Sequence, residues 1–191
     1  MTPRQTHTVG ILALGPVTEI VLKIVAAHVS GYLELPTCFL PQMALPPECL
    51  DERRGQYDAA RLINCLNGRS FAGCTKVLAL LDADLFVPIF THIFGEAQQG
   101  GSHAVISLFR LQYMENGAKS TDADFYERAA KVALHELGHL LDLFHCPDSA
   151  CIMHFSGTIE TLDTISMGFC PYCQSYLKQA GLKIEPAHTP F

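Results

Sequence analysis

Residues 121–145, TDADFYERAAKVALHELGHLLDLFH, decide how the rest of the chain must fold. Thr121 and Asp124 fit a capping box, a pairing of side chains with backbone N–H groups that begins a helix. The helix predicted from here to Leu141 is roughly 30 Å long at about 1.5 Å per residue. A cluster of histidines therefore lies at the end of a long helix.

The spacing of these histidines predicts one metal site. Four residues on a helix turn through about 400°, so His135 and His139 project from the same face. Glu136 lies one position round the helix, where its carboxylate can reach a metal-bound water without becoming a ligand. His145 can join them only if the helix stops, because a continued helix would carry it about 15 Å along the axis. The pair alone also fits two ordinary histidines, but the third favours a zinc site.

The turn that brings back His145 depends on Asp142. Glycine is the usual residue there in this pattern, because it reaches positive φ without steric penalty. Asp visits this left-handed region more readily than most other residues, at a cost of roughly 1 kcal/mol. Zinc binding at a structural site is worth about 10 kcal/mol or more. We therefore expect Asp142 to adopt the left-handed backbone conformation that this turn requires.

Four cysteines downstream predict a second metal site. Cys146 and Cys151 are separated from Cys170 and Cys173 by an 18-residue loop. Two close pairs of thiolates supply a closed tetrahedral zinc site, whose role is structural because no coordination position stays open. The other reading is four unrelated buried or redox-active cysteines. The four other cysteines are expected to be small core residues; they are Cys38, Cys49, Cys65 and Cys74.

Composition limits the class of protein. The chain has 191 residues, 49% hydrophobic, which predicts one compact domain over 1–191. Within it, residues 1–141 would form the sheet and active-site helix, and residues 142–191 a small zinc-pinned C-terminal subdomain. The net charge is −6 and the 13 Lys and Arg residues are scattered, which argues against nucleic acid and anionic membranes as partners.

The expected location is the cytoplasm. The N-terminal apolar run, Val9–Leu14, is too short for a signal peptide, and no run of 18 apolar residues suggests a membrane span. Thiols stay reduced in the cytoplasm, so eight cysteines are better explained as ligands or core residues than as disulfides.

The pattern of the remaining chain predicts an α/β fold with a mixed twisted sheet. Helices between strands imply crossovers and a parallel core. A hairpin is expected at the sheet's edge, and residues 41–58 as a surface loop. The predicted strands are Val9–Leu14, Leu35–Leu40, Val77–Leu81, His92–Phe94 and Ala104–Phe109, and the further helices are Thr18–Tyr32, Gln56–Asn67 and Tyr172–Gln179.

The string from His135 to Cys173 resembles the extended motif of the archaemetzincins, a branch of the metzincin metallopeptidases. It begins with HExxH, and the third histidine follows as the first letter of HC. Then come four residues, CIM, sixteen residues and CPYC. The segments RRGQYDA, HIFGEAQ and SLFRL also look like this family, so the resemblance covers nearly the whole chain. Two departures are Asp142 in place of glycine and a gap before Cys170 that is about one residue short.

The resemblance implies a metzincin-like fold and further roles. Met153 would be the Met-turn residue, a hydrophobic floor beneath the zinc ligands. Some metzincins place a tyrosine ligand two residues after this methionine, but Phe155 has no oxygen.

These observations predict a zinc peptidase with two Zn²⁺ per chain, acting on peptides or small proteins. Glu136 would be the general base for attack by zinc-bound water. Exo or endo action stays open, and aminopeptidase action is possible; Glu96 is expected to be a solvated loop carboxylate outside the site. The alternatives are a non-catalytic, zinc-stabilised peptide-binding pseudoenzyme and a zinc-ribbon-like adaptor. The sequence does not indicate an oligomeric state.

Overall fold

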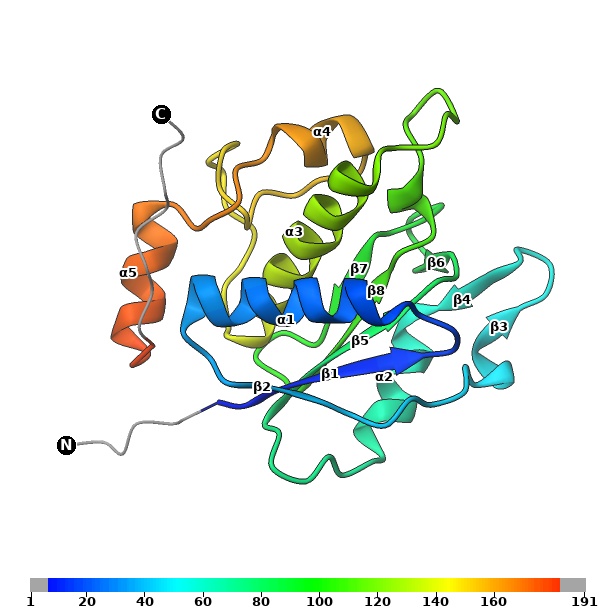
Figure 1. The fold of residues 1–191 in the computed structure, drawn as a ribbon, viewed down its shortest axis with the longest axis horizontal. Coiled ribbons are helices and arrows are strands. Elements are labelled where there is room, and N and C mark those ends of the chain that lie inside the picture. The colour runs from blue at the N-terminus through cyan, green and yellow to red at the C-terminus, as the bar shows by residue number, and fades with distance from the viewer. Residues whose placement is uncertain (1–6, 183–191) are drawn as a thin grey trace.

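The fold is a central sheet with helices on both faces, as the computed structural model shows (Figure 1). It describes residues 7–182, so the two ends of the predicted 1–191 domain lie outside the described residues. The strands are β1 (Val9–Leu14), β2 (Thr37–Phe39), β3 (Leu50–Asp51), β4 (Gln56–Asp58), β5 (Lys76–Leu81), β6 (Leu85–Phe86), β7 (Gly95–Ala97) and β8 (His103–Ser107). The α-helices are α1 (Glu19–Leu33), α2 (Ala59–Asn67), α3 (Asp122–Leu140), α4 (Ile159–Thr164) and α5 (Pro171–Gln179).

The main sheet has the strand order β2-β1-β5-β8-β7. The first four strands are parallel, and β7 pairs antiparallel with β8 at the edge. The predicted parallel core and edge hairpin are therefore confirmed. The hairpin brings β7 alongside α3, the helix that carries the histidines.

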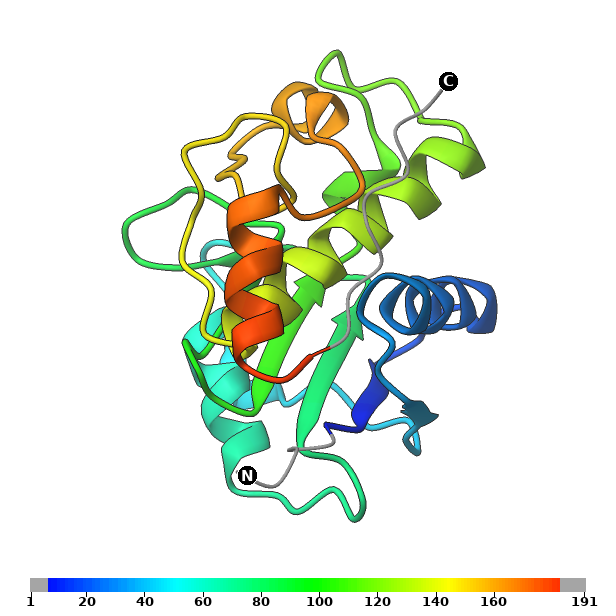
Figure 2. The ribbon, with the colours of Figure 1, turned by 90° about the vertical axis from the view of Figure 1, so that its left-hand side faces the viewer.

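The core lies on both faces of this sheet, because alternate residues of a strand point to opposite sides. In β5, Leu78 and Leu80 join the cluster formed with α1 and α3. Val77, Ala79 and Leu81 of the same strand join the cluster under α2. All of β5 is buried, as its unbroken apolar run predicts. In Figure 2 the sheet is seen between α2 and the α1 and α3 layer.

The sequence prediction was wrong between residues 41 and 58. This segment is not only a loop, since it contains β3 and β4, which form a small sheet with β6. The predicted helix from Gln56 begins only at Ala59, because the Asp58 side chain accepts a hydrogen bond from the backbone N–H of Arg61 and caps the helix there. The short helix α4 was also missed.

The edge strand also differs from the prediction at His92–Phe94. Ile93 instead bridges to Leu85 of the small sheet, and the strand that pairs with β8 is Gly95–Ala97. Residues 92–94 thus pass between the two sheets. The strand after them is the one that faces α3.

The four cysteines expected as core residues lie in two neighbouring pairs on the α2 side. The Sγ atoms of Cys49 and Cys65 are 3.6 Å apart. Burial and the neighbouring Cys38 thiol raise the pKa of Cys74 to about 12. Cys49 lies within the cluster under α2, and Cys65 and Cys74 pack against it.

Candidate active site

The helix α3 begins at the predicted capping box and ends one residue before the predicted Leu141. The side chain of Thr121 accepts from the backbone N–H of Asp124, and the Asp124 carboxylate accepts in return from the Thr121 N–H, which completes the capping box. The helix ends at Leu140. The next residue but one, Asp142, has φ of 70°, so the left-handed turn predicted there is present.

The Asp142 side chain makes contacts that glycine could not make. Its Oδ1 accepts a hydrogen bond from Gln99 of the β7–β8 loop at 3.2 Å, and its Oδ2 accepts one from the Tyr176 hydroxyl of α5 at 3.3 Å. Hydrogen bonds of this kind contribute about 1 kcal/mol each, enough to offset the backbone strain of a left-handed Asp. The third histidine therefore follows a turn held by two other segments.

The structure brings His135, His139 and His145 together, with one ring nitrogen of each within 4.8 Å of the others. The Nδ1 of His135 donates to the Ile152 carbonyl at 2.7 Å, and that of His139 to the Leu143 carbonyl at 2.8 Å. Because a carbonyl only accepts, both rings carry their proton on Nδ1. Their Nε2 lone pairs then face each other, 3.1 Å apart.

This nitrogen set fits zinc. A tetrahedral zinc with Zn–N bonds of about 2.05 Å separates its nitrogens by about 3.3 Å, close to the distance between the two Nε2 atoms. Burial, followed by the charges of His139 and His145, lowers the pKa of His135 to about 3. Burial also lowers the pKa of His139 and of His145. The imidazoles are thus kept neutral, the form that binds a metal.

Glu136 is held beside the triad in an apolar setting. Its side chain is 5% exposed, and burial, helped by the charge of Glu96, raises its pKa well above the ordinary value. A Cβ at Gly95 of β7 would lie 2.6 Å from Glu136 Oε1, so only glycine leaves room for the carboxylate. A glycine inside a strand is the sequence signal for such an approach, although the sequence analysis did not use it.

The expectation for Glu96 was wrong. It lies in β7 rather than in a solvated loop, is about half-buried, and lines the cleft in front of Glu136. Burial raises its pKa. The sequence analysis placed it in the loop because it placed the strand at His92–Phe94.

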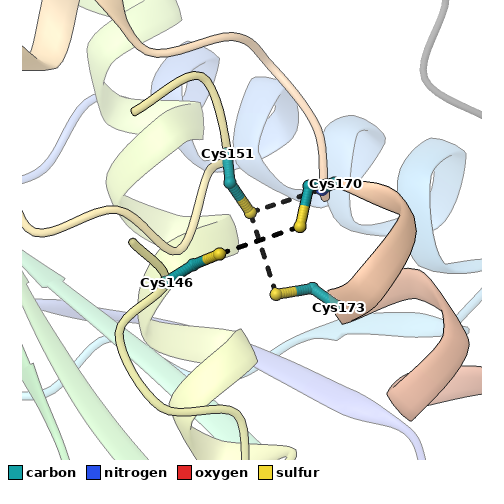
Figure 3. A group of neighbouring side chains, drawn as sticks. All are labelled: Cys146, Cys151, Cys170 and Cys173. Carbon is teal, nitrogen blue, oxygen red and sulfur yellow. Dashed lines mark hydrogen bonds between the residues drawn. The ribbon is translucent and has the colours of Figure 1, made fainter. Parts of the chain in front are cut away.

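The structure also gathers Cys146, Cys151, Cys170 and Cys173, whose sulfurs turn toward one centre (Figure 3). A tetrahedral zinc with Zn–S bonds of about 2.3 Å separates its sulfurs by about 3.8 Å. The Sγ distances are 3.7 Å for Cys146 to Cys170 and 3.8 Å for Cys151 to Cys173, which fits zinc closely. Among residues 7–182, these cysteines and the three histidines are the two groups of this kind that could hold a metal.

Met153 lies beneath the histidine helix. It is fully buried, and a Cβ at Gly138 would collide with its Sδ atom. The helix and the Met153 turn approach this closely because residue 138 has no side chain. Phe155 contributes no ligand atom, and its ring lies 5.3 Å from that of His145.

A cleft of about 440 Å³ opens over the triad. The edge strand β7, the helix α3 and the segment 152–157 contribute to its lining, as do Leu162 and Ile165. His154 also lines the cleft, although its spacing in the sequence did not indicate a site, and its Nδ1 donates to the Cys146 carbonyl at 3.0 Å. No helix among the described residues is long and apolar enough to cross a membrane.

Peptide hydrolysis is the chemistry that such a centre suits. Three neutral histidines leave a coordination position on zinc open, and an edge strand beside it can align an extended chain. The fold and the site define a zinc metallopeptidase.

Comparison with known proteins gives the family. Residues 18–179 match the profile of Peptidase family M54. An archaemetzincin of Methanopyrus kandleri is 36% identical over 153 residues, which are 80% of this chain and 83% of that protein. The chain therefore belongs to peptidase family M54, the archaemetzincins.

Solved structures agree with this assignment. The crystal structure of archaemetzincin from Methanopyrus kandleri has a TM-score of 0.82 and 32% identity, covering 94% of this chain and 98% of that one. A zinc-dependent peptidase from Methanocorpusculum labreanum has a TM-score of 0.75 and 26% identity, covering 88% and 99%. The predicted family and metzincin-like fold are confirmed.

Proposed function

We propose that this zinc metallopeptidase cleaves peptide bonds with Glu136 as general base and holds two zinc ions. His135, His139 and His145 would hold the catalytic ion, and Cys146, Cys151, Cys170 and Cys173 the structural one. The observation that carries the proposal is a buried carboxylate beside three histidines whose ring nitrogens converge. When bound, zinc supplies Lewis-acid polarisation of the peptide carbonyl and acidifies water.

The chain's own groups divide the remaining work. Glu136 takes a proton from the attacking water and returns it to the leaving amine. Its raised pKa makes the carboxylate a stronger base for the first step. The open edge of β7 would hold the substrate backbone by strand addition, and the apolar residues Leu162 and Ile165 would receive a side chain.

The decisive experiment replaces Glu136 by Gln. We expect kcat for a quenched fluorescent peptide to fall by at least about 10²- to 10⁴-fold, because the base is lost while the shape is kept. Glu160→Gln, an exposed carboxylate on α4, is the matched control and should leave kcat unchanged. If Glu136→Gln retained full cleavage, the proposed base would be wrong.

The rival function is peptide binding without cleavage. It predicts that the wild-type protein binds peptides as tightly as Glu136→Gln does and cuts none of them. The number of zinc ions is checked by elemental mass spectrometry of protein purified without added metal or chelator. Two zincs per chain, falling to one in His135→Ala, would support the assignment of both sites, whereas one zinc that persists in His135→Ala would contradict it.

A further inference from the structure

A second groove adjoins the cleft at His145. It runs between residues 142–148 and the first turns of α5, and its volume of about 590 Å³ includes the position of the proposed structural zinc, because Cys146, Cys170 and Cys173 are among its lining residues. The groove and the cleft share two lining residues, Phe144 and His145. A polypeptide lying in the cleft can therefore continue into the groove without leaving the surface.

Aromatic rings form much of the groove's surface. Phe144 is 72% exposed and Tyr172 77% exposed, both far more than large aromatic side chains usually are. Tyr172 and Tyr176 are four residues apart on α5, so they lie on one face of the helix. Together with Phe144 they provide ring faces on which a planar or cationic group can stack.

The charge of the groove is negative. Asp142 and Asp148 are exposed carboxylates in its lining, and none of its described lining residues is Lys or Arg. Lys76, a cation outside the groove, interacts with the charge of Asp142 but donates its hydrogen bonds to the carbonyls of Gly101 and Leu140, each at 2.7 Å. An incoming cation would thus meet two carboxylates and no competing Lys or Arg side chain, although the Asp142 carboxylate already accepts hydrogen bonds from Gln99 and from Tyr176.

We propose that this groove is a subsite for an arginine side chain of the peptide substrate. A guanidinium both stacks on aromatic faces and pairs with carboxylates, so it matches the two kinds of surface present. An apolar side chain would satisfy the rings but leave the carboxylates unused. This inference rests on the proposed peptidase function, since it assigns a preference to the same substrate.

The test measures binding in the Glu136→Gln background, where peptides stay intact. Fluorescein-labelled decapeptides carry one arginine, moved through successive positions of an otherwise constant sequence. Each has a partner peptide with norleucine at that position. We expect arginine to bind roughly tenfold more tightly than norleucine at one or two adjacent positions, in line with a cation–π contact plus an ion pair.

Groove variants locate the effect. Tyr172→Leu and Asp148→Asn should each remove most of the arginine preference, and Asn keeps the acceptor that the Ala150 N–H uses. Glu160→Gln, an equally exposed acid outside the groove, is the control and should preserve it. Higher salt should reduce the preference because exposed charges are screened.

The outcomes separate the two proposals. Equal binding of arginine and norleucine peptides at every position overturns the groove assignment while leaving the cleft intact. So does an arginine preference that survives both groove variants. If no peptide binds at all, the proposed substrate of the cleft is itself wrong, and the groove assignment falls with it.

Discussion

The position of the Glu136 carboxylate depends on a residue that has no side chain. Gly95 of β7 lies directly against this carboxylate. Along the chain, 24 residues separate β7 from α3, the helix that carries Glu136. We predict that Gly95→Ala lowers kcat by about 10- to 100-fold while KM changes little, because a displaced base weakens the chemical step and not the binding of substrate. Steady-state kinetics with a fluorogenic peptide measures both constants.

The control for this variant is Gly31→Ala. A Cβ at Gly31 in α1 meets nothing within 4 Å, so kcat should stay the same and the free energy of unfolding should rise by about 0.5–1 kcal/mol. A Gly95→Ala enzyme with normal kcat would show that the carboxylate can move without loss.

For single residues, contacts between side chains that are close in the chain could be predicted better than contacts between side chains that are far apart in it. The spacing of His135, His139 and His145 was sufficient to bring them together, since a helix and one turn connect them. The left-handed Asp142 could also be predicted. The contact of Gly95 with Glu136 could not, because it depends on how the edge strand packs against the helix.

Among the elements, the two C-terminal helices each bury few residues. The helix α5 buries Cys173 and Leu177, and α4 buries Ile159 and Leu162. Burial raises the pKa of Cys151 to about 11, so without a metal this thiol keeps its proton near neutral pH. Structure in the segment should therefore depend on the cysteine cluster.

We predict that Cys170→Ser removes one zinc per chain and increases amide hydrogen exchange across residues 146–182, while β1 and β5 stay protected. Structural zinc contributes about 10 kcal/mol or more, which two short helices with few buried residues cannot replace. Mass spectrometry of exchanged peptides measures this. Cys65→Ser, a half-buried thiol outside the cluster, should leave the zinc content and the exchange pattern unchanged. Unaltered protection in Cys170→Ser would contradict the structural role.

Long elements were predictable and short ones were not. The runs that form β1, β5 and α3 each contain six or more residues with a clear pattern, and they occur close to where the sequence places them. The strand β3 has two residues, too few for any periodicity, and β7 has three, one of them glycine. Such elements are fixed by their partners in the sheet and not by their own sequence.

For the whole molecule, the buried histidines make stability depend on pH. Burial lowers the pKa of His135 to about 3 and lowers the pKa of His139 and His145, while an unfolded histidine titrates near 6.5. Below about pH 6.5 the unfolded chain thus binds more protons than the folded one at these residues. The raised pKa values of Glu136 and Glu96 act in the opposite direction, but these are two groups against three, and burial also lowers the pKa of His92 and of His103.

We predict that the metal-free protein is most stable above about pH 6.5 and loses stability as the pH falls toward 5, by about 1.4 kcal/mol per pH unit for each extra proton bound by the unfolded chain. Urea unfolding at pH 7, 6 and 5 measures the trend. His135→Gln should have a shallower dependence because it removes the most strongly shifted histidine. Stability that stays constant or rises on acidification would contradict the prediction.

The order of parts along the chain has a consequence for how the molecule is made. Every strand of the two described sheets ends at or before Ser107, whereas the seven proposed ligands lie from His135 to Cys173. Synthesis proceeds from the N-terminus at about 5–20 residues per second, so the ribosome releases all of these strands before either ligand cluster is complete. The newly made sheet must therefore stay in solution without the segment that follows it, and neither zinc site can form until the chain from His135 onward has been made.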